Sequence, residues 1–157
     1  MSNFDKLRAI SFPEFLVLFV SLLTLPVASV LLKLCGVRKT ERLMARFSRL
    51  DIQRGVSQTR VNRERVNKVR VNQVARMVSI AAVLVPYQAR CLEQAMTVWW
   101  MLGVMGISST IRLGVSKSGG SIEAHAWVLY KGEIVIGQMN DQREFTPLLD
   151  INIERQQ

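Results

Sequence analysis

The chain has 157 residues, of which 49% are apolar, which is enough to bury one core and predicts a single domain over residues 1–157. The formal net charge is +9, and residues 38–76 account for it with twelve Lys or Arg against three Asp or Glu. Phe47 is the only aromatic residue in that basic segment, so it offers little surface for base stacking, and nucleic acid is disfavoured as a partner. Anionic lipid, an acidic peptide or a solvated helix face remain as interpretations.

The two cysteines, Cys35 and Cys91, lie in dissimilar contexts and match neither a disulfide framework nor a structural zinc motif. We therefore expect a protein of the reducing cytoplasm, with no metal and no cofactor.

An apolar helix is predicted to begin at residues 11–14, where Ser11 is a suitable N-cap and Glu14 can complete a capping box, and to run to about Leu34. Residues 15–32 form an uncharged run whose length is at the lower limit for a membrane span. Pro26 would kink such a span. Acidic residues near the start of the chain disfavour a signal peptide. We favour a buried or partner-covered helix over a spanning one, and membrane association through residues 13–34 stays open.

Two more helices complete the helical half, residues 1–85. A basic amphipathic helix is predicted over residues 40–50. A longer helix is predicted over about residues 57–84, where one face is apolar at helical spacing: Val71, Val74, Val78, Ala81 and Val85.

The second part, residues 86–157, begins with a cysteine near the N-terminus of a predicted helix. Pro86 breaks the preceding helix, and apolar residues then recur at helical spacing after Cys91: Leu92, Ala95, Met96, Trp99 and Leu102. Cys91 thus falls in a first helical turn, where unpaired N–H groups and the helix dipole favour a thiolate. The alternative is a small hydrophobic residue packed in the core.

Strands are predicted over residues 107–115, 122–130 and 133–136, with a glycine-serine loop at 116–121 and a turn at Lys131-Gly132. The fold class is α+β, a helical half followed by an antiparallel sheet packed on the cysteine helix. His125, the single histidine, lies on the middle strand. Cys91 and His125 are the minimum pair for a thiol hydrolase.

A third group that orients the imidazole is expected on the next strand or just beyond it. If Lys131-Gly132 is a two-residue loop, Tyr130 pairs with Glu133 and His125 faces Gln138. Asp141 can supply a negative charge and ranks slightly above Gln138, while Asn140 is a weaker choice. The backbone N–H of Cys91, with Gln88 as a candidate second donor, could form an oxyanion hole.

The sequence resembles the leader peptidases of lasso-peptide biosynthesis, which are transglutaminase-like cysteine proteases. The resemblance covers most of the chain and rests on these segments in order: Arg90-Cys91-Leu92-Glu93-Gln94-Ala95, Leu102-Gly103, Gly106-Ile107, Leu113-Gly114-Val115, Ala124-His125-Ala126-Trp127-Val128, Val135-Ile136-Gly137 and Phe145-Thr146-Pro147-Leu148. Where the family carries an aspartate directly after the glycine, this chain has Gln138, and Asp141 occupies the next acidic place.

The resemblance implies a transglutaminase/papain-like core in which Cys91 attacks a peptide bond and His125 acts as base and then as acid. The substrate would be a ribosomally made precursor peptide, cut so that a separate asparagine-synthetase-like cyclase can close the ring. A PqqD-like leader-binding protein would deliver the precursor. Two other functions stay open: transglutaminase-like acyl transfer to an amine, and a non-catalytic adaptor that binds membranes or peptides.

Overall fold

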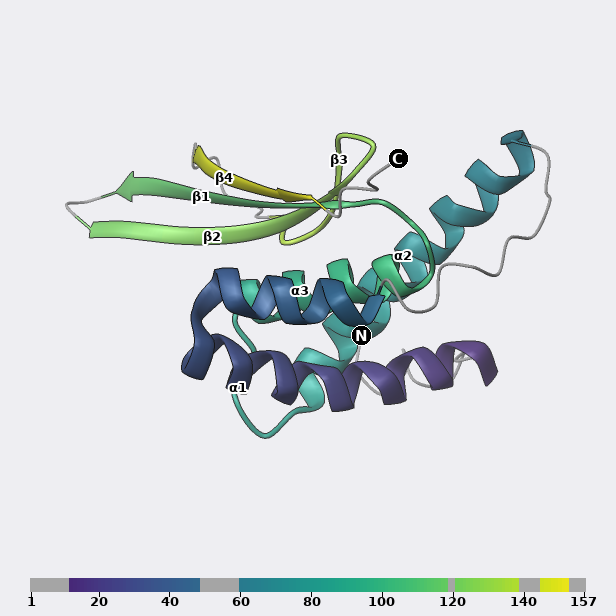
Figure 1. Ribbon diagram of the computed structural model, residues 1–157, viewed down its shortest axis with the longest axis horizontal. Coiled ribbons are helices and arrows are strands. Elements are labelled where there is room, and N and C mark those ends of the chain that lie inside the picture. The colour runs from purple at the N-terminus through teal and green to yellow at the C-terminus, as the bar shows by residue number, and fades with distance from the viewer. Residues whose placement is uncertain (1–11, 49–59, 119–120, 139–144, 153–157) are drawn as a thin grey trace, which may run out of the picture.

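The computed structural model of the protein describes residues 12–48, 60–118, 121–138 and 145–152. The described parts form three helices, α1 (Phe12–Ser48), α2 (Arg60–Leu84) and α3 (Cys91–Val104). They are followed by four strands: β1 (Thr110–Ser118), β2 (Ser121–Tyr130), β3 (Glu133–Ile136) and β4 (Thr146–Asn152). The sheet forms one layer and the helices gather on one side of it, so the predicted α+β class is confirmed (Figure 1).

Helix α1 consists of two segments that meet at Gly36, whose φ of 73° and ψ of 171° leave the helical region. Such a positive φ is accessible to glycine at little cost, so the chain can turn back there. The first segment runs along the side of the helical layer farthest from the sheet, and the second returns beside α3 (Figure 1). The break agrees with the two helices predicted on either side of residues 34–40. Pro26 lies inside the first segment without such a departure.

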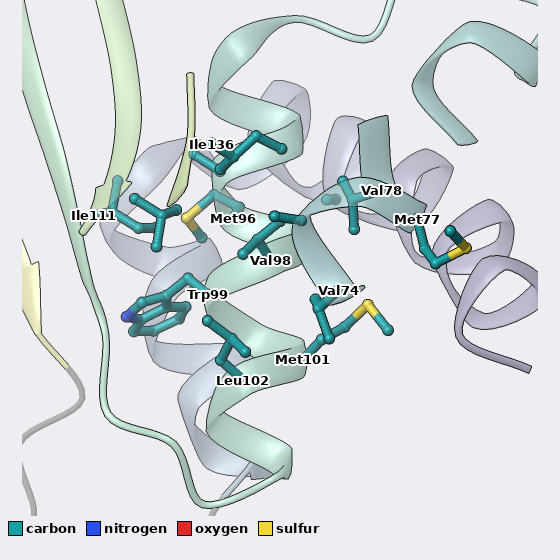
Figure 2. Close-up of a cluster of buried hydrophobic side chains, with 14 of the residues drawn as sticks. Val74, Met77, Val78, Met96, Val98, Trp99, Met101, Leu102, Ile111 and Ile136 are labelled. Atoms are coloured by element: carbon teal, nitrogen blue, oxygen red, sulfur yellow. The ribbon is translucent and has the colours of Figure 1, made fainter. Parts of the chain in front are cut away.

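The core lies where α3 is enclosed by the other two helices and by the sheet. All five residues of the stripe predicted on α2 are buried. Figure 2 shows Met96 of α3 beside Ile111 of β1 and Ile136 of β3, while Val74 and Val78 approach from α2. Because Trp99 and Met96 are fully buried, the sequence prediction that this helix packs against the sheet is confirmed.

The sheet is antiparallel with the order β3-β2-β1-β4. Its fourth strand was not among the predicted elements. Pro147 lies within β4, and a proline in a short run disfavours a strand unless it lies at a sheet edge. Strand β4 occupies that edge, beside β1.

The turn between β2 and β3 was predicted correctly, but the register beyond it was not. Tyr130 pairs with Glu133 as expected, and the register then shifts between Leu129 and Val128, which pairs with Ile136. The expectation that His125 faces Gln138 assumed an unbroken register, and the shift at Val128 contradicts that assumption. An irregularity of this kind adds a residue to one strand, and no residue type in this segment predicts its position.

Helix α1 has the length and composition of a helix that could cross a membrane. Over Pro13–Arg46 its most apolar window has a mean hydropathy of 2.6, and 28% of that window is buried. The core helix of a soluble protein or a signal sequence can have the same properties, so composition alone does not place the protein.

Candidate active site

Cys91 is the first residue of α3, as the sequence predicts. Arg90 precedes it in an extended conformation and acts as the N-cap, and its carbonyl accepts the first helical hydrogen bond from Gln94 N at 3.1 Å. The N–H groups of a first turn have no partner within the helix. The half-buried Cys91 thiol therefore lies at the positive end of the α3 dipole.

The first turn is held by a buried carboxylate that sequence reasoning did not single out. Glu93 Oε2 accepts a hydrogen bond from the backbone N of Arg90 at 3.0 Å, and Glu93 Oε1 accepts one from Ser29 Oγ of α1 at 2.8 Å. Glu93 and Ser29 are both buried. The glutamate at the third helical position is the sequence signal of a capping box, and it could have identified this residue.

In the segment before Cys91, Tyr87 is partly buried and Gln88 is exposed. The Tyr87 hydroxyl is buried and has no hydrogen-bond partner among the described residues. Burial and the nearby charge of Glu93 raise the pKa of Tyr87 above its usual value of 10.0. Gln88, the candidate second oxyanion donor, is exposed, so its amide is open to solvent or to a substrate carbonyl.

His125 is oriented by a backbone carbonyl. Its Nε2 lies 2.6 Å from the carbonyl oxygen of Gly137. A carbonyl can only accept, so the imidazole Nε2 carries the proton and Nδ1 keeps its lone pair in the neutral ring. Gly137 has a φ of 88°, and a Cβ atom there would lie 2.6 Å from the Ala126 carbonyl oxygen. The close approach that positions this acceptor therefore requires glycine.

Aromatic rings surround the imidazole. The rings of His125 and Trp127 stack at 5.7 Å between centroids, and Phe145 lies 5.6 Å from His125. The Trp127 ring lies over Gly114, where a Cβ atom would come within 2.6 Å of Trp127 Cη2. Gly114 thus leaves room for the ring, which explains a glycine in the middle of β1.

The alternation of side chains along β2 determines on which face of the sheet His125 lies. Side chains alternate along a strand, and Ala126 and Val128 of β2 belong to the core against which Cys91 packs. His125 and Trp127 therefore point to the opposite face of the sheet from α3. No hydrogen bond joins the Cys91 thiol to the His125 ring in the part of the chain that the structure describes.

The third group remains a prediction. Gln138 is exposed, and Asn140 and Asp141 lie outside the described residues. In this structure the Gly137 carbonyl holds the ring nitrogen that such a group would hold. Within the described ranges, no cluster of three or more His, Cys, Asp or Glu side chains could hold a metal ion.

Comparison with known proteins places these features in a family. No curated protein and no solved structure matches the chain. The Transglutaminase-like superfamily matches residues 34–150, a range that contains Cys91, His125 and the whole sheet except the end of β4. Members of this superfamily are generally cysteine-type enzymes, among them peptidases and acyltransferases. Because the match covers most of the sequence and the α+β architecture agrees with it, the chain belongs to the transglutaminase-like superfamily.

Proposed function

We propose that the protein is a cysteine peptidase that removes the leader from a ribosomally made lasso-peptide precursor. The observation that carries the proposal is the position of Cys91 as the first residue of α3, where its thiol lies at the positive end of the helix dipole. Membership of a superfamily of cysteine-type enzymes supports the same conclusion.

In the proposed reaction, Cys91 gives its thiol proton to His125, and the resulting thiolate attacks the carbonyl carbon of the bond between leader and core while the carbonyl π electrons move to oxygen. The Cys91 N–H and Gln88 stabilise that oxyanion. The C–N bond then breaks, and the leaving amine takes a proton from His125. Water, deprotonated by His125, hydrolyses the thioester, which releases the leader as a carboxylate and restores the thiol.

The reaction requires His125 to reach the α3 side of the sheet. Because side chains alternate, a local change in the register of β2 would turn the imidazole to that side. The irregularity in pairing between Val128 and Leu129 is next to this segment. Catalytic hydrogen bonds are often absent in a free enzyme and form only with substrate bound.

Asp141 is proposed as the third member of the triad, with Gln138 as its alternative. Once His125 leaves Gly137, either side chain could accept the ring N–H, and Asp141 would also stabilise the imidazolium. Delivery of the precursor by a PqqD-like protein and ring closure by an asparagine-synthetase-like cyclase complete the proposed pathway, which we place in the cytoplasm or at the membrane surface.

The experiment is cleavage of the cognate precursor by the whole protein together with its leader-binding partner. Cys91→Ala should lower the rate about a thousandfold or more, because no other group replaces the nucleophile. Cys35→Ala is the matched control and should keep nearly full activity, since Cys35 is half-buried on α1. Full cleavage by Cys91→Ala would overturn the proposal.

Mass spectrometry of the same reaction separates hydrolysis from acyl transfer. Hydrolysis gives two free peptides, whereas a transglutaminase-like transfer joins the acyl group to an amine. A joined product would replace the peptidase by the acyltransferase.

One observation favours a second candidate, a non-catalytic adaptor. The thiol and the imidazole lie on opposite faces of the sheet, so the described structure has no assembled base beside Cys91. An adaptor predicts that a thiol-reactive probe labels Cys91 no faster than Cys35, even with the precursor present. Faster labelling of Cys91 favours the peptidase.

A further inference from the structure

The first segment of α1 carries its large apolar side chains on the outside. Two Phe, three Leu and two Val side chains are each more than half exposed: Phe15 60%, Leu16 60%, Phe19 53%, Leu23 57%, Val27 55%, Val30 53% and Leu34 78%. Successive members are mostly three or four residues apart, so they form one continuous stripe along the helix. We call these seven residues the outer stripe.

The face that packs inside is more polar than the outer stripe. Ser21, Ala28 and Ser29 are buried there beside Leu18 and Leu25. Ser21 Oγ donates to the carbonyl of Val17 at 2.7 Å. A helix that is surrounded by water in the folded protein is expected to bury its larger apolar side chains, because burial of each one stabilises the fold by about 1.5–3 kcal/mol. Seven large apolar side chains on the outside indicate that something other than water covers the outer stripe.

A bilayer surface fits the stripe in length and charge. From Phe15 to Leu34 the helix is about 30 Å long at 1.5 Å per residue. Exposed cations follow directly at its end and on the second segment: Lys33, Arg38, Lys39, Arg42 and Arg46. An apolar helix face next to Lys and Arg is the pattern of a helix that lies in an anionic membrane interface.

An apolar cavity continues the stripe toward the second segment of α1. It has a volume of about 290 Å³ and is lined by Leu23, Thr24, Val27, Leu31, Leu43, Met44 and Trp100. Its lining is almost wholly apolar and it is open on one side, so it can accept an apolar guest from outside. An acyl chain of the bilayer could enter it beside Leu23.

The contacts of the inner face of α1 favour a helix that lies along a membrane surface over one that crosses the membrane. Its inner face is tied to the domain through the buried hydrogen bond from Ser29 Oγ to Glu93 at 2.8 Å. Arg76 of α2 also contacts Glu14 near the start of α1 at 3.4 Å. A spanning orientation would break both contacts and leave the Glu93 carboxylate without one of its donors, which is costly for a buried charge.

We propose that the outer stripe and the adjacent cations dock the protein flat on an anionic lipid bilayer. The proposal does not depend on the peptidase activity. Because Ser29 and Glu93 connect α1 to the first turn of α3, docking would hold Cys91 at a fixed depth relative to the bilayer.

The test is flotation of the full-length protein with vesicles of phosphatidylcholine and phosphatidylglycerol, compared with phosphatidylcholine alone. The protein should bind the anionic vesicles more tightly, and salt should weaken that binding. Phe19→Ser with Leu23→Ser should reduce the affinity about a hundredfold, because two large side chains no longer enter the interface. Lys39→Gln with Arg42→Gln should reduce binding to anionic vesicles only.

The matched control is Val69→Ser with Ile122→Ser, which removes two exposed apolar side chains on α2 and β2 and should leave vesicle binding unchanged. All substituted positions are exposed, so far-UV circular dichroism should match that of the unsubstituted protein. Equal binding by the Phe19 and Leu23 variant, or no binding to either vesicle, would overturn the proposal. If the unsubstituted protein is a dimer and the Phe19 and Leu23 variant is a monomer, the outer stripe binds a second copy of the chain and the membrane proposal is wrong. Resistance to alkaline carbonate extraction would indicate a spanning helix and contradict a flat one.

Discussion

At the scale of single residues, Glu93 links the start of α3 to helix α1. Its carboxylate accepts from the Arg90 backbone and from Ser29, so it fixes both the first turn of α3 and the packing of α1. Cys91 lies in the chain between Arg90 and Glu93, the two residues that the first of these hydrogen bonds joins. The electrostatic environment of the thiol therefore depends on a residue that does not take part in the proposed chemistry.

Glu93→Ala should destabilise the fold by about 2–4 kcal/mol, because it leaves a buried hydroxyl and a backbone N–H without an acceptor. The free energy of unfolding in urea measures this loss. Glu133→Ala is the control: its ion pair with Lys68 at 3.0 Å is exposed, so the change should cost less than about 1 kcal/mol. Equal effects of the two substitutions would contradict the role given to Glu93.

Tyr87 makes stability depend on alkaline pH. Its pKa is raised above 10.0 by burial and by Glu93, so the folded state favours the neutral phenol. Above pH 10 the unfolded chain loses this proton while the folded chain retains it, and stability should fall as pH rises through that range. Urea titrations between pH 8 and 11 should show a smaller fall for Tyr87→Phe. A fall of the same size in both proteins would exclude Tyr87 as the source.

At the scale of elements, the end of β3 sets the state of the imidazole. Gly137→Ala adds a Cβ atom 2.6 Å from the Ala126 carbonyl and 2.9 Å from Trp127 Cβ, so the strand end must move and the carbonyl with it. Nitrogen-detected NMR should then show His125 changing from the Nε2–H tautomer to a mixture. The spectrum is unambiguous because the chain has one histidine.

Gly132→Ala provides the comparison. Gly132 also has a positive φ, 85°, but a Cβ atom there meets nothing within 4 Å. It should therefore cost only the backbone strain of about 1–2 kcal/mol and leave the tautomer unchanged. A tautomer shift in Gly132→Ala as well would show that strain in the hairpin, and not the contact with Ala126, controls the ring.

The edge strand β4 is attached by a charged pair. Arg112 of β1 donates to both carboxylate oxygens of Asp150, at 2.8 and 2.7 Å, and these hydrogen bonds lower the pKa of Asp150 below 3.8. The stability that the pair contributes is present above pH 3.8 and is lost as pH falls below it. Both side chains are more than a third exposed, so screening limits the effect to under about 1 kcal/mol.

Arg112→Ala should therefore raise the pKa of Asp150 toward 3.8 and leave the midpoint of urea unfolding nearly unchanged at pH 7. A carbon-detected NMR titration of the Asp150 carboxyl measures the shift. An unchanged pKa would mean that the pair does not form in solution.

Local patterns in the sequence predicted the parts of the fold that depend on local structure. Pro86 and the stripe after Cys91 located the start of α3, and the apolar spacing on α2 located its buried face. Strand β4 and the shift at Leu129 escaped prediction because both depend on pairing between strands. The face on which His125 lies depends on that register, so the sequence could identify the residue but not its orientation.

At the scale of the whole molecule, the question is whether the imidazole and the thiol can meet across the sheet. The helical layer holds Cys91, and the opposite face of the sheet holds His125. Arg112 and Asp150 are partly exposed on the same face as Trp127, so that face is not covered by helices. A catalytic cycle would therefore require β2 to change its position relative to α3.

Disulfide cross-linking tests directly whether β2 can change its position relative to α3. In a Cys35→Ala background, His125→Cys should form a disulfide with Cys91 under mild oxidation, because bonding requires Cα atoms about 4.4–6.8 Å apart with facing Cβ atoms. Glu123→Cys, two residues earlier on the same face of β2, should cross-link more slowly. The rate for His125→Cys should rise when the precursor and its leader-binding protein are added. If neither variant cross-links under any of these conditions, position 125 of β2 does not reach Cys91. The non-catalytic adaptor then becomes the better interpretation of this transglutaminase-like chain.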